Sequence, residues 1–183
     1  MDKKENFQDM HPFIELKTKR FFLRMLKPSD WKAISYLRSD TEVNKFVKRP
    51  SAETKEKALA FIAKIENRIG EHSFYYWSIS EESDSEMLGS ICLWNFSYDR
   101  KTGEVGYDLN PAFQGIGVMD EALKKVLEFG FNHLKLHTIE AYTQKNNRSS
   151  TKLLERNGFK RNLDRTDANN PSNWIFERYT DHL

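Results

Sequence analysis

The chain has 183 residues, 38% of them hydrophobic and 13% aromatic, which is sufficient for one substantial core in one domain. The 29 basic and 27 acidic residues leave a formal charge of +2, so the overall charge gives no electrostatic basis for a nucleic-acid partner or an anionic membrane surface. The single cysteine, Cys92, excludes an intramolecular disulfide, and no residues are spaced as a metal-ligand cluster, so we expect no metal.

The N-terminal segment differs in composition from the rest of the chain. Residues 1–12 are too polar to offset the entropy of ordering, so we expect a flexible tail followed by a single domain over residues 13–183. The N-terminus has no apolar leader region, and no run of about 18 apolar residues occurs in the chain. We therefore expect a cytoplasmic protein without a membrane partner.

The first part of the chain predicts one strand and several helices. Alternation over residues 20–26 predicts the strand. Ser29 is expected to cap a helix, because apolar residues recur after it at helical spacing, and a second short helical piece is expected over residues 42–47. The clearest early helix has its capping sequence at Ser51 and runs to Gly70.

The remaining chain predicts further strands, joined by polar turns and interrupted by two helices. Aromatic and β-branched residues mark the strands, and a broad apolar face marks the first of these helices. The strands are expected over residues 74–80, 87–96, 104–109, 137–143, 159–163 and 174–179, with one helix after a glycine turn and another over 147–157.

The glycine turn lies between a strand and a helix and has the sequence Gln114-Gly115-Ile116-Gly117-Val118-Met119. A helix N-terminus offers unpaired backbone N–H groups, and its dipole favours negative charge. Gly115 and Gly117 lack a β-carbon, so they can adopt positive φ and let phosphate oxygens approach the backbone. Such a glycine pair is weak evidence alone, because it often supplies only a turn.

The residues around the glycine pair strengthen its interpretation as a phosphate site. Gln114 and Gly117 occupy the first and fourth positions of a segment that resembles motif A of the GCN5-related N-acetyltransferases (GNAT), Gln/Arg-x-x-Gly-x-Gly/Ala, from which Met119 departs at the sixth position. The whole run over residues 114–122 is similar to the RimJ/RimL-type branch, which acetylates ribosomal proteins. Two further segments, residues 16–24 and 147–159, resemble that branch in order and spacing.

The resemblance covers most of the chain from Phe13 and implies an α/β (α+β) GNAT fold. It implies a mixed central sheet of about seven strands with about four helices. The sheet is expected to splay between strands 4 and 5, which end at Leu109 and begin near His137, with acetyl-CoA in the opening. The residues expected to bind acetyl-CoA are Leu109, Gln114, Gly115, Ile116, Gly117, Val118, Met119 and Asn147.

Direct attack of an amine on a thioester implies three roles for side chains and backbone. By resemblance, a bulge near Leu109 turns a main-chain N–H toward the thioester carbonyl. Glu104 is either the proton acceptor for the amine or an exposed strand acid. Many relatives place a thiolate-protonating tyrosine where Leu154 stands, so Ser150 is either the substitute donor or a helix-start residue. Asn147 either contacts the pantetheine arm or caps the last helix.

The acceptor side is expected at residues 31–47 and at the loop of Trp94 and Asn95, with His137 and Tyr142 as packing residues. The favoured activity is transfer of acetyl to the N-terminal amine of a protein. A small amine such as a polyamine, amino acid or aminoglycoside is the alternative acceptor, and a non-catalytic CoA-binding module is a third interpretation. The sequence leaves monomer and homodimer open.

Overall fold

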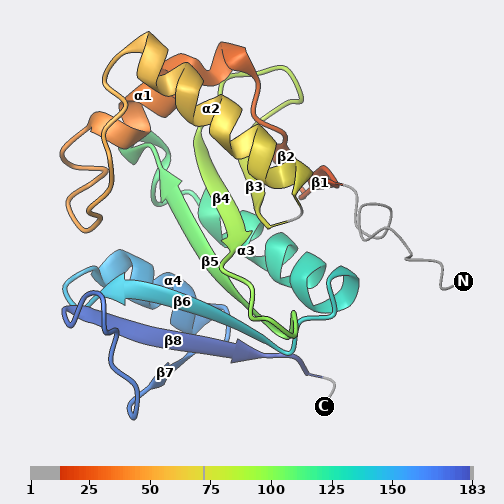
Figure 1. The fold of residues 1–183 in the computed structure, drawn as a ribbon, viewed down its shortest axis with the longest axis vertical. Helices are drawn as coiled ribbons and strands as arrows, with labels where there is room; N and C mark the ends of the chain where they lie inside the picture. The colour runs from red at the N-terminus through yellow and green to blue at the C-terminus, as the bar shows by residue number, and fades with distance from the viewer. Residues whose placement is uncertain (1–12, 72, 182–183) are drawn as a thin grey trace, which may run out of the picture.

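The computed structural model describes residues 13–71 and 73–181, so the expected tail over 1–12 lies outside the described residues. Within this part, the chain forms one open mixed sheet with α-helices on both faces (Figure 1). The sheet order is β1-β2-β3-β4-β5-β6-β8-β7. The strands are β1 (Leu16–Lys17), β2 (Phe22–Arg24), β3 (Tyr75–Ser80), β4 (Gly89–Trp94), β5 (Thr102–Leu109), β6 (Thr138–Gln144), β7 (Lys160–Asn162) and β8 (Asn173–Tyr179). The α-helices are α1 (Trp31–Ser39), α2 (Lys55–Gly70), α3 (Val118–Glu128) and α4 (Arg148–Arg156).

The mixed α/β fold agrees with the sequence interpretation, and the strand count is one higher in the described residues. The additional strand is β1, in which Leu16 and Lys17 pair antiparallel with β2. Two residues are too few for an alternating pattern to be recognised, so no periodic signal marks this strand. The expected splay between strands 4 and 5 therefore lies between β5 and β6.

Two helix starts and one expected helix differ from the sequence interpretation. Asp30, not Ser29, directly precedes α1, and Thr54, not Ser51, caps α2 by accepting a hydrogen bond from the backbone N–H of Lys57. Residues 41–46 form hydrogen-bonded turns rather than a helix. Their backbone bonds mix three- and four-residue spacings, which interrupts the regular helical ladder.

The core has two parts because the sheet is covered on both faces. Figure 1 shows α1 and α2 over one face and α3 and α4 over the other. All six residues of β3 are buried, as expected for a strand between two layers. On β5, Val105, Tyr107 and Leu109 belong to the core on the α3 side, whereas Cys92 and Trp94 of β4 pack toward α1 and α2. The two faces of the sheet at β4 and β5 therefore pack against different helices.

A buried ion pair fixes the junction between β2 and α1. The Arg24 guanidinium donates to both carboxylate oxygens of Asp30, at 2.8 and 2.9 Å, and the side chains are only 3% and 5% exposed. Asp30 also accepts the backbone N–H of Lys27. Removing one partner from such a pair leaves an uncompensated buried charge, which is strongly destabilising.

We predict that Asp30→Ala lowers the free energy of unfolding by about 3–5 kcal/mol, because Arg24 then lacks its buried counter-ion. Urea denaturation followed by circular dichroism measures the change. The control is Asp84→Ala. It removes the ion pair between Lys27 and the Asp84 carboxylate, which is 87% exposed, and should leave the free energy of unfolding nearly unchanged. Equal losses in the two variants would show that burial of the Arg24 pair carries no special stability.

Candidate active site

The sheet opens between β5 and β6. These parallel strands pair only at Thr102, Gly103 and Glu104 of β5, after which the two strands diverge (Figure 1). On their outer sides both strands remain paired, β5 with β4 and β6 with β8. The second half of β5 therefore exposes one backbone edge to a wedge inside the sheet.

The backbone of Leu109 faces this wedge. Asn110 donates its N–H to Leu88 O on the β4 side, and Lys101 O accepts from Thr138 on the β6 side. Because backbone groups of successive strand residues point to alternate edges, the N–H of Leu109 points toward β6. The expected bulge is not found: six consecutive pairs from Glu104 to Leu109 keep one constant register with β4. Regular alternation suffices to direct this N–H into the wedge.

The glycine turn follows β5 and has the backbone geometry that a phosphate site requires. Gly115 and Gly117 have φ of 79° and 85°, in the left-handed region that favours glycine. A β-carbon at Gly115 would meet nothing within 4 Å, and one at Gly117 would meet only the Arg20 guanidinium. The space over the turn is therefore open, and the backbone of residues 115–117 is accessible to a ligand.

The turn ends at the N-terminus of α3, whose first residues divide into exposed and buried side chains. Ile116 is 55% exposed, whereas Val118 and Met119 are only 1% and 7% exposed and pack in the core. Val118 and Met119 can therefore offer a ligand only their backbone N–H groups, which lack partners within the helix. Gln114 extends its side-chain amide to Leu109 O at 3.5 Å, which links the turn to the end of β5.

Two acids in the first turn of α3 would oppose an anion, but basic groups compensate both. Asp120 pairs with Lys124 and Arg156, at 2.7 and 2.8 Å. Glu121 pairs with Arg20 at 2.6 Å. These ion pairs leave the positive end of the helix dipole available to a pyrophosphate.

Arg20 is a site residue that the sequence reasoning did not single out. Its guanidinium donates to Ile116 O at 2.8 Å and to Glu121, so it braces the glycine turn from outside. Thr18 also donates to Glu121, at 2.9 Å. The partners are separated by about a hundred residues in sequence, so no local pattern could reveal the contact.

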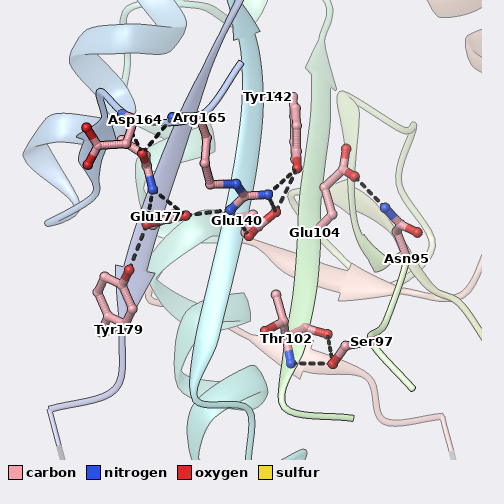
Figure 2. A network of polar contacts seen from close by, with 11 residues as sticks. Asn95, Ser97, Thr102, Glu104, Glu140, Tyr142, Asp164, Arg165, Glu177 and Tyr179 are labelled. Atoms are coloured by element: carbon pink, nitrogen blue, oxygen red, sulfur yellow. Dashed lines mark hydrogen bonds and ion pairs between the residues drawn. The ribbon is translucent and has the colours of Figure 1, made fainter. Parts of the chain in front are cut away.

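Glu104 lies at the last position where β5 and β6 are paired. Burial raises the pKa of its carboxyl to about 7, and the nearby acids Glu140 and Asp167 add to the increase, while a hydrogen bond from Asn95 opposes it. Asn95 Nδ2 donates to Glu104 Oε2 at 3.1 Å (Figure 2). A carboxyl with this pKa can exchange a proton near neutral pH, as a general base must.

A polar network covers the neighbouring strands on the same face as Glu104. Figure 2 shows Arg165, from the segment between β7 and β8, between Glu140 of β6 and Glu177 of β8. The Tyr142 hydroxyl donates to Glu140 at 2.8 Å, and the Tyr179 hydroxyl donates to Glu177 at 2.7 Å. The expected packing residue Tyr142 is thus also a member of a charged cluster beside Glu104.

Ser150 and Asn147 lie at the start of α4. Asn147 caps the helix, because its Oδ1 accepts the N–H of Ser150 at 3.1 Å. Ser150 is 8% exposed, and its hydroxyl forms a 2.8 Å hydrogen bond with the hydroxyl of Tyr107 on β5. Leu154, where a tyrosine was considered, is fully buried in the core.

Glu104 and Ser150 therefore lie on opposite faces of the sheet. Side chains three positions apart on a strand point to opposite faces, so Glu104 and Tyr107 project to different layers, and Ser150 lies with Tyr107. Tyr107 was missed because its partner is distant in sequence. A carboxyl with a pKa of about 7 on one face and a hydroxyl pair on the other suit a reaction in which two substrates enter from opposite sides.

Other chemistry finds little support in the described residues. Within 13–71 and 73–181, no three or more His, Cys, Asp or Glu side chains are grouped to hold a metal. In the same part of the chain, no helix combines the length and apolar character needed to cross a membrane. Burial raises the pKa of the Cys92 thiol to about 12, which keeps the nucleophilic thiolate scarce.

Comparison with known proteins connects this geometry to one family. Residues 20–160 match the family model described as acetyltransferase (GNAT) domain. The chain is 30% identical over 148 residues to the uncharacterized N-acetyltransferase YnaD of Bacillus subtilis, covering 81% of this chain and 84% of that protein. It is 31% identical over 146 residues to the uncharacterized N-acetyltransferase p20 of Bacillus licheniformis, covering 80% and 82%.

Solved structures show the same fold at low identity. One is RimL, described as a ribosomal L7/L12 alpha-N-protein acetyltransferase in complex with coenzyme A, with a TM-score of 0.80, 18% identity and coverage of 92% of this chain and 99% of that chain. Another is a ribosomal-protein-S5-alanine acetyltransferase from Vibrio fischeri, with a TM-score of 0.78, 21% identity and coverage of 92% and 98%.

We predict that Gly117→Val weakens CoA binding at least about tenfold, since a β-branched residue at φ of 85° costs about 1–2 kcal/mol and narrows the anion site. Isothermal titration calorimetry with CoA measures the affinity. Gly70→Ala is the matched control, because a β-carbon there meets nothing within 4 Å. A folded Gly117→Val protein with unchanged CoA affinity would remove the glycine turn from the binding site.

We predict a pH-dependent stability difference between the wild type and Glu104→Gln. The folded-state pKa of about 7 lies above the ordinary value of 4.5, so the native state binds this proton more tightly than the unfolded chain. Wild-type stability therefore falls as pH rises from about 4.5 to about 7, and the glutamine variant escapes this loss. The free energy of unfolding of the variant relative to that of the wild type should be greatest above pH 7.

Urea denaturation at pH 4.5, 6 and 8 measures this difference. Glu66→Gln, which removes one exposed carboxylate on α2, serves as the matched control. A difference that stays constant between pH 4.5 and 8 would mean that the pKa of Glu104 is not raised on folding.

Proposed function

The chain belongs to the GNAT family of acetyl-CoA-dependent N-acetyltransferases, and from this premise we propose that its acceptor is the N-terminal amine of a protein. The observation that carries the proposed acetyl transfer to an amine is the wedge between β5 and β6, with a carboxyl of pKa about 7 on one face and a serine hydroxyl on the other. The acceptor reaches Glu104 from the α1 and α2 side, and CoA occupies the α3 and α4 side.

The donor side fits acetyl-CoA. The glycine turn and the first backbone N–H groups of α3 hold the pyrophosphate, with Gly115 and Gly117 leaving room for its oxygens. The exposed edge of β5 from Val105 to Leu109 offers N–H and C=O groups that need polar partners, and the amide-bearing pantetheine arm supplies them. When bound, acetyl-CoA supplies an acetyl group activated as a thioester.

Glu104 prepares the acceptor. An ammonium group has no lone pair, so the amine must lose a proton before it can attack a carbonyl carbon. The Glu104 carboxylate accepts this proton, directly or through one water, and its pKa of about 7 is well matched to an α-amino group with a pKa of about 8. Asn95 holds the carboxylate in place by its hydrogen bond to Oε2.

Two further groups stabilise charge as the acetyl group is transferred. The N–H of Leu109 points into the wedge and donates to a carbonyl oxygen on which negative charge develops. The Ser150 hydroxyl donates a hydrogen bond to the sulfur when the carbon–sulfur bond breaks. Both donors are held by the regular structure around them, Leu109 by its pairing with β4 and Ser150 by the Asn147 cap.

The choice of a protein N-terminus rests on the local motifs together with the structural relatives. The glycine turn and the Asn147-to-Ser150 segment resemble the RimJ/RimL branch, and two of the structures with the same fold carry ribosomal-protein acetyltransferase names. A small amine is the second candidate, because one GNAT fold serves many acceptors. Glu104 and the neighbouring Glu140 are partly exposed, so the end of a peptide chain can reach the Glu104 carboxyl.

The test compares acceptors of both classes at a fixed acetyl-CoA concentration. A library of peptides with free N-termini is assayed beside the same peptides with blocked N-termini but free lysine side chains. Spermidine, free amino acids and an aminoglycoside form the small-amine group. Thiol release measures turnover, and mass spectrometry should locate the acetyl group on peptide N-termini. Turnover of small amines without peptide acetylation would exclude the proposed acceptor, and CoA binding without any turnover would favour a binding module.

We predict that Glu104→Gln lowers kcat/KM at least about a hundredfold for the best peptide, because the proton acceptor is lost. The wild-type rate should rise with pH through about 7, as Glu104 becomes a carboxylate. In the pH–rate profile of the variant, the rise near pH 7 should be absent. Only the rise near pH 8 should remain, where the peptide amine loses its proton. An unchanged limb near pH 7 would assign the titration to another group.

A further inference from the structure

A hydrogen bond between two hydroxyl groups crosses from β5 to α4 on the CoA side of the wedge. The Tyr107 hydroxyl and the Ser150 Oγ are 2.8 Å apart. Tyr107 precedes Leu109 by two positions, so its side chain lies on the same face of β5 as that of Leu109 and its backbone faces the same edge. The pair therefore lies where the opened edge of the sheet meets the start of α4.

Either hydroxyl can donate in such a pair, but the chemistry favours one direction. A phenol is a stronger acid than an alkyl alcohol, so Tyr107 is the better donor and Ser150 the better acceptor. The serine backbone is held independently, because its N–H donates to Asn147 Oδ1 at 3.1 Å. With a lone pair of Oγ engaged by the tyrosine, the proton of Ser150 turns away from Tyr107.

We propose that Tyr107 is a positioning residue for the acetyl-transfer reaction, whose hydroxyl donates to Ser150 and so orients and polarises the Ser150 hydroxyl toward the sulfur of CoA. The inference rests on the proposed function, in which Ser150 faces the departing sulfur. A serine hydroxyl otherwise rotates freely among its acceptors. In a chain of hydrogen bonds each donor strengthens the next, so the tyrosine makes the serine a better donor to a thiolate.

The Tyr107 hydroxyl stays protonated, and so can donate a hydrogen bond, over the pH range in which a thiol titrates. Burial raises the pKa of its hydroxyl to about 12, and the hydrogen bond with Ser150 opposes this increase. The phenol therefore keeps its proton through the titration of a thiol, which has a pKa of about 8.5 in an unperturbed cysteine. No proton leaves the tyrosine in the proposed role, because the tyrosine only donates a hydrogen bond.

The experiment measures the pKa of the CoA thiol in the binary complex, from the ultraviolet absorbance of the thiolate as pH is varied. It needs no acceptor, and CoA itself is the probe. The wild type is compared with Tyr107→Phe, Ser150→Ala and the double variant. Tyr142→Phe is the matched control, because that tyrosine lies on β6 and donates to Glu140 instead. Thermal unfolding and CoA affinity are recorded for each protein.

Ser150→Ala should raise the thiol pKa by about 0.5 to 1 pH unit, the worth of one hydrogen bond of about 1 kcal/mol. Tyr107→Phe should raise the thiol pKa by a smaller amount, because the serine hydroxyl remains but loses its orienting donor. The double variant should show no larger shift than Ser150→Ala, because the tyrosine acts through the serine. Tyr142→Phe should leave the thiol pKa at the wild-type value. A graded variant, Tyr107→3-fluorotyrosine, keeps the hydroxyl and makes it a stronger donor, so it should lower the thiol pKa.

A thiol pKa that rises in Ser150→Ala but not in Tyr107→Phe overturns the inference, and leaves Tyr107 with a structural role visible only in thermal unfolding. If neither variant changes the thiol pKa, Ser150 does not face the sulfur and the inference fails with it. Should Tyr107→Phe not fold, an unshifted thiol pKa with 3-fluorotyrosine overturns it equally. Failure of the proposed function is a separate result, seen in the acceptor assay, which the thiol titration does not use.

Discussion

The separation of β5 from β6 after Glu104 is the constraint on which the site depends. A sheet normally satisfies its backbone by continuous pairing, and an unpaired edge in the interior costs free energy. Here each strand keeps a full antiparallel ladder on its outer side, β5 with β4 and β6 with β8, so the sheet survives the loss of the inner pairs. The opening is therefore a stable feature of the fold that leaves a row of backbone groups without a strand partner.

The same opening explains how one strand can serve two substrates. In a continuous sheet, the side chains of Glu104 and Tyr107 would be separated by the sheet itself, because they project to opposite faces. Where the sheet is open, groups on the two faces can act on one pair of reacting atoms. Burial on one face raises the pKa of Glu104 to about 7, and the Asn147 cap holds Ser150 on the other. In the proposed mechanism, the base and the hydroxyl donor therefore lie on different faces of the sheet and act on the same reacting atoms.

Local patterns in the sequence predicted much of this arrangement, and the failures share a physical cause. Strands with alternating or aromatic residues and the glycine turn were found because their signals lie within a few residues. The two-residue strand β1 is too short to carry a period, and the turns of residues 41–46 are settled by tertiary contacts. Arg49 makes such tertiary contacts. It donates hydrogen bonds to Asn44 and to the backbone O of Leu37, and it forms an ion pair with Asp108 of β5.

The contacts that complete the site are the ones that sequence reasoning could least supply. Glycines give the phosphate turn its backbone shape but also make it flexible in the absence of outside support. Arg20 gives that support from the far end of the chain, by donating to Ile116 O and pairing with Glu121 in the first turn of α3. The glycines in the sequence permit the conformation of the turn, and the contacts made in the fold hold the turn in that conformation. In the proposed site, affinity for CoA therefore depends on the contacts that Arg20 makes with the glycine turn and α3.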